Sequence, residues 1–232
     1  MMAKRIFAST RIQFANTRTL YWVPLVVLVG AYIISFIIYA AIPGDEMKMG
    51  GGGLQAPLWF YIAFGAQLVA FYFPFALALA LTRGEFYMGF ILNALLCGLV
   101  CGSIITLGGV LERLSHGWWI EGYFFYLPWM WQAGWGGAWF LTASIVWLFM
   151  SIGFTFAAIY KRWGMLFLAL ILLIFALGLA IAMVVIARTD AWIEVFTWFA
   201  GFGPGEVANF VLLCTVMSVF AGWMVLRRMA IR

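Results

Sequence analysis

The heptapeptide Leu81-Thr82-Arg83-Gly84-Glu85-Phe86-Tyr87 separates two long apolar stretches of this chain. It brings a cation and an anion close together and follows them with two aromatic rings. In so apolar a chain, a short charged turn of this kind marks the boundary between two membrane-crossing helices. The turn is therefore the predicted place at which the protein contacts something soluble.

The composition of the whole chain indicates a membrane protein. Its 232 residues are 67% hydrophobic and 9% charged, whereas a soluble domain carries about 25% charged residues. So apolar a chain of this length has no room for a soluble catalytic domain beside its membrane spans. The net charge of +5 comes from basic residues at the ends of apolar stretches, so it indicates membrane topology and no nucleic-acid partner.

Six apolar stretches are long enough to cross the hydrocarbon layer, which takes about 20 helical residues. They predict an all-α protein with six transmembrane helices. An N-terminal amphipathic helix at the membrane interface is expected over residues 1–20, and the six-span domain over residues 21–232. The predicted spans are 21–43, 57–81, 87–111, 137–160, 164–187 and 206–227.

Six crossings put both termini on one side of the membrane, and the basic residues are divided unequally between the two sides. Of the 13 basic residues, only Lys48, Arg113 and Arg188 fall on the side away from the termini. Because cytoplasmic loops carry the excess of Lys and Arg, both termini are predicted to be cytoplasmic.

The N-terminal segment repeats a basic residue every seven positions, and phenylalanines follow the first two. Such spacing gives a basic stripe flanked by rings, as in a helix that lies in the headgroup layer with its cations toward anionic lipid. The alternative is a plain positively charged leader. The residues of this stripe are Lys4, Phe7, Arg11, Phe14 and Arg18.

Two segments on the opposite side, 112–136 and 190–205, are rich in aromatic residues. Their rings form either a belt in the headgroup layer or a lid that contacts substrate. The second segment is also expected to dip into the membrane and return, which requires protein around its backbone. The candidates for an outer lid or gate are Trp118, Trp119, Trp129, Trp192, Glu194 and Phe199.

The chain offers few reactive groups. His116 is its one histidine, too few for a histidine metal centre or a haem held by two histidines. No Asp, Glu, Lys or Arg lies in the middle of a predicted span, which disfavours ion-coupled transport. The sequence also lacks the phosphate-binding loop Gly-x-x-x-x-Gly-Lys-Ser/Thr. We therefore expect no enzymatic activity, no metal and no cofactor in this chain. If ATP drives the protein, another protein chain must bind and hydrolyse it.

The stretch Phe75-Ala-Leu-Ala-Leu-Ala-Leu-Thr-Arg-Gly-Glu-Phe-Tyr-Met-Gly89 resembles the ABC-2 type permeases, the membrane subunits of ATP-driven exporters. Six spans, a basic leader and an aromatic segment before the last span add to the resemblance. Small bacterial permeases of this type often carry Thr-Arg-Arg before an aromatic pair at this point. Here Gly84 stands in place of the second arginine, which leaves one fewer cation for a partner.

The resemblance implies that the turn is a coupling helix docked in a cleft of an ATPase subunit. Thr82, Arg83, Glu85 and Phe86 then become docking residues, and a partner groove that buries Phe86 and Tyr87 would use them as aromatic anchors. ATP and Mg²⁺ would bind to the ATPase subunits, and a second permease copy, identical or diverged, would complete the transporter. The implied location is the bacterial plasma membrane. An amphipathic or hydrophobic substrate is expected, because the spans offer apolar and weakly polar walls.

Three other interpretations remain open. Arg83 and Glu85 can simply keep the turn in water while the two rings sit in the headgroup layer. The chain also fits the substrate-binding membrane subunit of a vitamin importer, with residues 112–136 as a lid over an apolar pocket. A non-transport membrane scaffold or immunity protein is the third.

Overall fold

The computed structural model describes residues 2–14, 22–43, 47–50 and 52–229. Over these residues the protein is almost entirely helical, and six of its helices are long and apolar enough to cross a membrane. The predicted all-α fold with six spanning helices is confirmed. The spanning helices are α2 (Val23–Ala41), the segment Gly52–Ala78, α5 (Arg83–Leu114), α6 (Gly134–Trp163), α7 (Met165–Arg188) and α9 (Pro204–Leu226).

The second spanning segment is not one regular helix. It consists of α3 (Gly52–Gln67), the π-helical turn η2 (Leu68–Tyr72) and α4 (Phe73–Ala78). Pro74 explains the irregularity, because it has no N–H to donate to the carbonyl of Ala70, four residues earlier. That carbonyl accepts a hydrogen bond from Lys161 Nζ instead, at 2.7 Å.

The helices α3, α5, α6 and α9 form the centre of the molecule, and α6 packs against the other three. The closest approach is between α3 and α6. A Cβ atom on Gly153 would lie 1.9 Å from the carbonyl oxygen of Ile62, and one on Gly65 would lie 2.1 Å from that of Met150. Only glycine fits at these two crossings, as is common where spanning helices pack closely.

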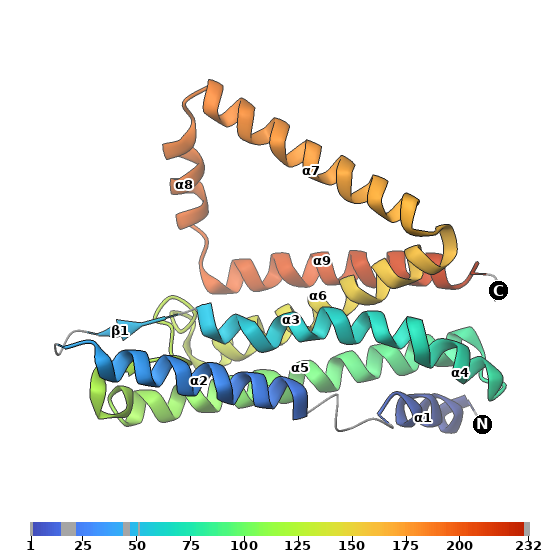
Figure 1. The fold of residues 1–232 in the computed structure, drawn as a ribbon, viewed down its shortest axis with the longest axis horizontal. Helices are drawn as coiled ribbons and strands as arrows, with labels where there is room; N and C mark the ends of the chain where they lie inside the picture. Colours follow the sequence, from blue (N-terminus) through green and yellow to red (C-terminus); the bar gives the residue numbers. More distant parts are fainter. Residues whose placement is uncertain (1, 15–21, 44–46, 51, 230–232) are drawn as a thin grey trace.

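Short elements lie at both ends of this bundle. At one end, α1 (Met2–Gln13) lies near the end of α9, and this end is called the terminal end below (Figure 1). At the opposite, loop end, β1 (Lys48–Met49) pairs in parallel with β2 (Gly122–Tyr123), next to the turn η3 (Gly117–Glu121). The helix α8 (Trp192–Ala200) crosses from α7 to α9 at the same loop end (Figure 1).

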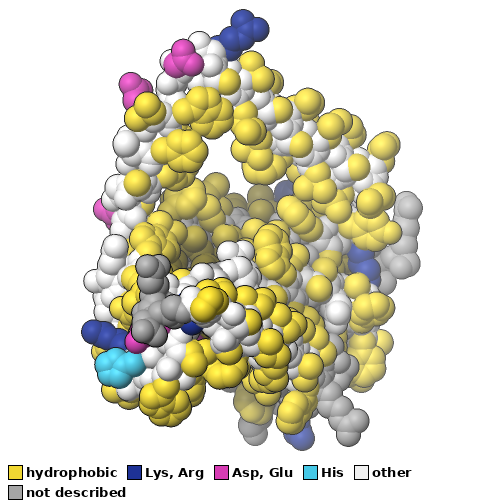
Figure 2. Space-filling view, turned by 60° about the vertical axis from the view of Figure 1, so that its left-hand side comes forward, with side chains coloured by type: hydrophobic (Ala, Val, Ile, Leu, Met, Phe, Trp, Pro, Cys, Tyr) yellow, Lys and Arg dark blue, Asp and Glu magenta, His cyan; other side chains and the backbone are white. Residues whose placement is uncertain are grey.

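The helix α7 stands apart from the bundle (Figure 1). None of its residues is buried, although it has the highest hydropathy of the six spanning helices. Figure 2 shows hydrophobic side chains over most of the visible face, with charged side chains at its edges. Apolar side chains on the outside and charges at the rims are what a lipid environment requires.

Candidate functional site

The predicted contact turn lies at the terminal end, between α4 and α5. Thr82 begins α5 through a reciprocal pair of hydrogen bonds with Glu85. The Glu85 N–H donates to Thr82 Oγ1 at 3.2 Å, and the Thr82 N–H donates to Glu85 Oε2 at 2.8 Å. This capping box satisfies backbone donors that the first turn of a helix leaves free. The third span therefore begins at Arg83, earlier than the residue 87 predicted from hydropathy.

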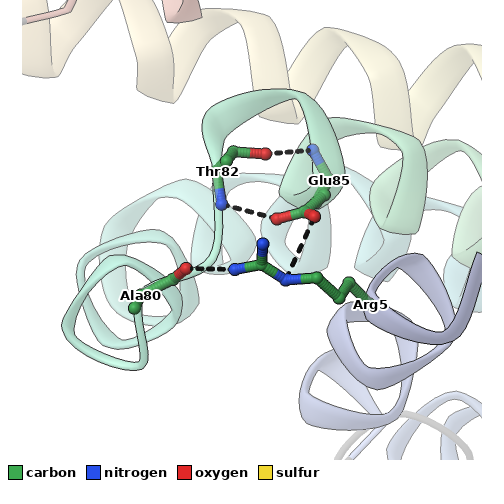
Figure 3. Close-up of polar contacts among 4 residues, drawn as sticks. All are labelled: Arg5, Ala80, Thr82 and Glu85. Carbon is green, nitrogen blue, oxygen red and sulfur yellow. Dashed lines mark hydrogen bonds and ion pairs between the residues drawn. The ribbon is translucent and has the colours of Figure 1, made fainter. Parts of the chain in front are cut away.

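A single arginine of α1 joins the two sides of this turn (Figure 3). Arg5 Nε lies 3.2 Å from Glu85 Oε1, at the start of α5, and its guanidinium also donates to the carbonyl of Ala80, in the turn that follows α4. Ala80 has a left-handed backbone conformation, with φ of 58°, which turns the chain from α4 toward α5. Arg5 thereby ties α1 to the turn and to the start of α5.

Polar residues extend the contact between α1 and α5 into the protein. Gln13 Nε2 donates to the carbonyl of Phe86 at 3.1 Å, and Asn93 Nδ2 donates to Gln13 Oε1 at 3.3 Å. A Cβ atom on Gly89 would lie 2.6 Å from Ser9 Oγ, so the two helices approach closely at this glycine. Buried side chains that bond in this way fix the helix in one position. The face of α1 that packs on α5 is therefore its polar face.

The start of α5 is also tied to the end of α9. Arg83 donates from Nη1 to the carbonyl of Arg227 at 2.8 Å, and the Tyr87 hydroxyl donates to the carbonyl of Val219. The rings of Tyr87 and Trp223 have centroids 5.1 Å apart. The first turns of α5 thus connect α1, α4 and α9 at one end of the molecule.

The structure corrects the predicted role of two residues of the turn. Phe86 is fully buried, and its ring packs against Phe73 and Phe154 with centroids 5.2 and 6.5 Å away. Tyr87 is 6% exposed. Both rings are anchors for the protein's own core, so neither is offered to a partner as predicted.

The surface that the turn does expose lies just before α5. Leu79 is 52% exposed, and Ala78, Ala80 and Thr82 are also exposed. Arg83 is half-buried and Glu85 is 6% exposed. Of the predicted docking residues, Thr82 and Arg83 are therefore accessible, and Leu79 joins them as the apolar side chain that the sequence did not single out.

The predicted basic stripe on the N-terminal helix is described in part. Phe7 is 71% exposed, Arg11 is exposed and Phe14 is half-buried just after α1. Lys4 lies in α1, and nothing is described of its side chain. Arg18 lies outside the described residues, as does the rest of 15–21. The exposed positions leave Phe7 and Arg11 on the surface of α1, as a helix in contact with lipid requires.

At the loop end, a buried glutamate that the sequence did not single out organises the backbone. Glu112 is fully buried, and its carboxylate accepts hydrogen bonds from the backbone N–H groups of Phe124, Phe125 and Tyr126 at 2.6 to 3.1 Å. The indole N–H of Trp118 donates to the same carboxylate at 3.1 Å. Four donors around one carboxylate compensate for its burial. In the sequence, the signal for this buried glutamate was a lone acidic residue between an apolar span and an aromatic loop.

This glutamate holds together a segment with unusual backbone angles. His116, Trp118, Trp119 and Glu121 all have φ between 50° and 62°, a region that residues other than glycine seldom adopt. Each such residue costs on the order of 1–3 kcal/mol unless its surroundings hold it there. The hydrogen bonds to Glu112 supply that support and fix the shape of the loop.

The six outer gate candidates lie in three places: η3, the turn that contains Trp129 before α6, and α8. Trp118 packs edge-on against Tyr32, Trp119 is 84% exposed, and Trp129 is 42% exposed at the mouth of a cavity. Trp192, Glu194 and Phe199 lie on α8, which has no buried residue. The ring of Trp192 stacks on Phe196 of the same helix. Most of the segment 190–205 forms the short helix α8 across the loop end, and its dip into the membrane stays a prediction.

The cavity beside Trp129 has a volume of about 300 Å³. It lies beneath the loop end, between α3, α5 and α6, and its walls are mostly apolar, with Gln55 and Thr142 as polar groups. Within the described residues, no three His, Cys, Asp or Glu side chains are placed to hold a metal ion. The chemistry available to the cavity is therefore that of a small apolar binding pocket.

No protein-family model matches this chain, and neither does a curated protein or a solved structure.

Proposed function

We propose that this protein is the permease subunit of an ATP-driven exporter of the ABC-2 type, working with separate ATPase subunits and a second permease copy. It has no catalysis of its own in this role, and ATP and Mg²⁺ bind to the ATPase subunits. The substrate is amphipathic or hydrophobic. Both termini face the cytoplasm of a bacterial cell, in line with the excess of basic residues on their side of the membrane.

The observation that carries this proposal is the joint formed at the terminal end. Arg5 bonds to both Ala80 and Glu85, so a push on the turn acts on α1, α4 and α5 together. Arg83 and Tyr87 extend the same connection to α9. A soluble ATPase that contacts the exposed residues of the turn, 78–80 and 82, would therefore move several helices at once. Such a mechanical link between a partner and the spans is what a permease needs.

Co-purification of an ATPase tests this proposal. The full chain is isolated from membranes of its native host in mild detergent, and ATP hydrolysis by the purified material is measured. We expect hydrolysis with the wild-type chain and its loss with Leu79→Glu, because a charge replaces the exposed apolar side chain of the turn. Leu114→Glu is the matched control, since Leu114 is 74% exposed at the other end of α5.

Two results would contradict the proposal. One is the absence of any co-purifying ATPase from a folded wild-type preparation. The other is equal hydrolysis with Leu79→Glu and with the wild-type chain, which would show that the turn is not the contact. Equal loss with Leu114→Glu would also count against it, because the effect would then not depend on the terminal end.

The 300 Å³ cavity favours a second candidate function, that of a substrate-binding membrane subunit of an importer. In that role Trp129 and the loop around Glu112 form a lid over an apolar ligand. The purified chain would then retain a small molecule, which mass spectrometry after denaturation would detect. Trp129→Ala should release it. A purified chain that carries no such molecule and fails to bind apolar vitamins removes this candidate.

A further inference from the structure

A cavity of about 760 Å³ lies at the terminal end, at the junction of three segments. Its walls come from α4, from the end of α6 with the start of α7, and from the residues that follow α9. Three of the residues that line it are basic, namely Lys161, Arg162 and Arg228. None of its lining residues is acidic. The cavity is therefore a concentration of positive charge, separate from the turn at 78–82.

Two of these cations bond within the protein to neutral groups. Lys161 Nζ donates to the carbonyl of Ala70 at 2.7 Å, and Arg162 Nη1 donates to the carbonyl of Val225 at 3.4 Å. The Arg162 guanidinium also lies 4.2 Å from the ring centre of Trp163. Within the described ranges, the one ion pair is that of Arg5 and Glu85. Carbonyls and rings orient these side chains, but they do not neutralise the charge.

The place of the cavity and its walls indicate the kind of anion that fits. Lys161 and Arg162 lie in the last turn of one spanning helix, and Gly164, with φ of 86°, connects it directly to the next. The cavity thus lies where spans end, at the level of lipid headgroups. Phe73, Leu77 and Met165 provide an apolar wall beside the cations. An amphipathic anion, with a charged head and apolar chains, matches both parts of the lining.

We propose that this cavity binds the phosphate group of an anionic phospholipid from the membrane leaflet at the terminal end. Arg162 and Arg228 would donate hydrogen bonds to the phosphate oxygens, and Lys161 would add a point charge. The acyl chains would run along the apolar wall. This inference does not depend on the proposed transport function, because it rests only on the charge, position and shape of the cavity.

Native mass spectrometry of the purified full chain tests the proposal. Phosphatidylglycerol and the zwitterionic phosphatidylcholine are added in turn, and the lipid retained by the chain is quantified. The wild-type protein should retain more phosphatidylglycerol than phosphatidylcholine. The double variant Lys161→Gln/Arg228→Gln should bind it about 30-fold more weakly, as expected for the loss of two basic contacts. Arg188→Gln, which removes an exposed cation at the far end of α7, should bind it like the wild type.

A second double variant, Lys161→Arg/Arg228→Lys, keeps both charges and should keep the preference, so a loss in the glutamine variant reports charge and not misfolding. Equal retention of the two lipids by the wild-type chain would overturn the proposal. So would unchanged binding of phosphatidylglycerol by the glutamine variant.

Inorganic phosphate is added as a competitor in a parallel series. If it displaces the lipid completely at equal concentration, the cavity recognises free phosphate and the assignment to a lipid is wrong.

Discussion

The two ends of α5 each hold a buried glutamate, but the two carboxylates are satisfied in different ways. Glu85, at the terminal end, is 6% exposed and pairs with Arg5, whose side chain is 48% exposed. Glu112, at the loop end, is fully buried and accepts hydrogen bonds from neutral N–H groups. The first arrangement depends on a partly solvated cation from another helix. The second lies within one continuous segment of chain.

This difference indicates which end can respond to a partner. An ion pair open to water is weak and is screened by salt, so Arg5 can part from Glu85 at little cost. A carboxylate held by several buried donors cannot release them without leaving them unpaired. The terminal end is therefore the adjustable end of α5, and the loop end is the fixed one.

The largest effect is expected from Glu112→Ala. The substitution leaves at least three backbone N–H groups of the loop without an acceptor, at about 1–3 kcal/mol each, so the loss of stability is on the order of 3–9 kcal/mol. Limited proteolysis of the purified chain would show it as rapid cleavage within 116–126. Glu121→Ala is the matched control in the same loop, because Glu121 makes a single long contact with Tyr123. Equal protection of both variants would show that Glu112 does not hold the loop.

A smaller but still large effect is expected from Phe86→Ala. Removing a fully buried ring from the core costs about 3–5 kcal/mol, whereas Leu79→Ala, at an exposed position of the same turn, should change stability by less than about 0.5 kcal/mol. The stabilities of the two variants are compared by thermal unfolding in detergent. If Phe86→Ala were as stable as the wild type, the ring would not be part of the core, and the original prediction of a docking role would return.

The smallest effect is expected from the ion pair of Arg5 and Glu85. Arg5→Gln should loosen α1 and increase hydrogen exchange at the backbone amides of α1, with little change in overall stability. Glu85→Gln should loosen α1 as well but keep the capping geometry of Thr82. High salt should bring the wild-type exchange close to that of Arg5→Gln. Exchange that is unaffected both by salt and by either substitution would mean that the pair does not hold α1.

Much of the fold could be predicted from the sequence because it follows from local hydropathy. The span predicted over 164–187 is observed as Met165–Arg188, since only the length of an apolar stretch is needed to find it. The boundaries that differ depend on hydrogen bonds. The capping box of Thr82 and Glu85 starts α5 early, and its Thr-x-x-Glu pattern was present in the sequence. The helix α3 starts at Gly52, so Pro57 lies inside it, at the cost of one backbone hydrogen bond, that to the carbonyl of Gly53.

The site could be predicted only in outline. The charged turn marked the start of α5, but the direction of Phe86 depends on Phe73 and Phe154, which are distant in sequence. The same holds for Ser9 and Gln13 of α1. In sequence they only weakened the amphipathic pattern, yet they form the face that packs on α5. Contacts between distant segments decide these cases, and hydropathy carries no signal for them.

The most direct test of the claim that the terminal end of α5 is the partner surface is site-specific photo-crosslinking in the native host. A photoreactive amino acid is placed at Leu79 in one strain and at Leu114 in another, so that both ends of α5 are probed at exposed positions. Crosslinked partners are identified by mass spectrometry. The probe at Leu79 should capture a soluble ATPase, and the probe at Leu114 should capture none. Capture of lipid alone at Leu79, from a folded and inserted protein, would contradict it.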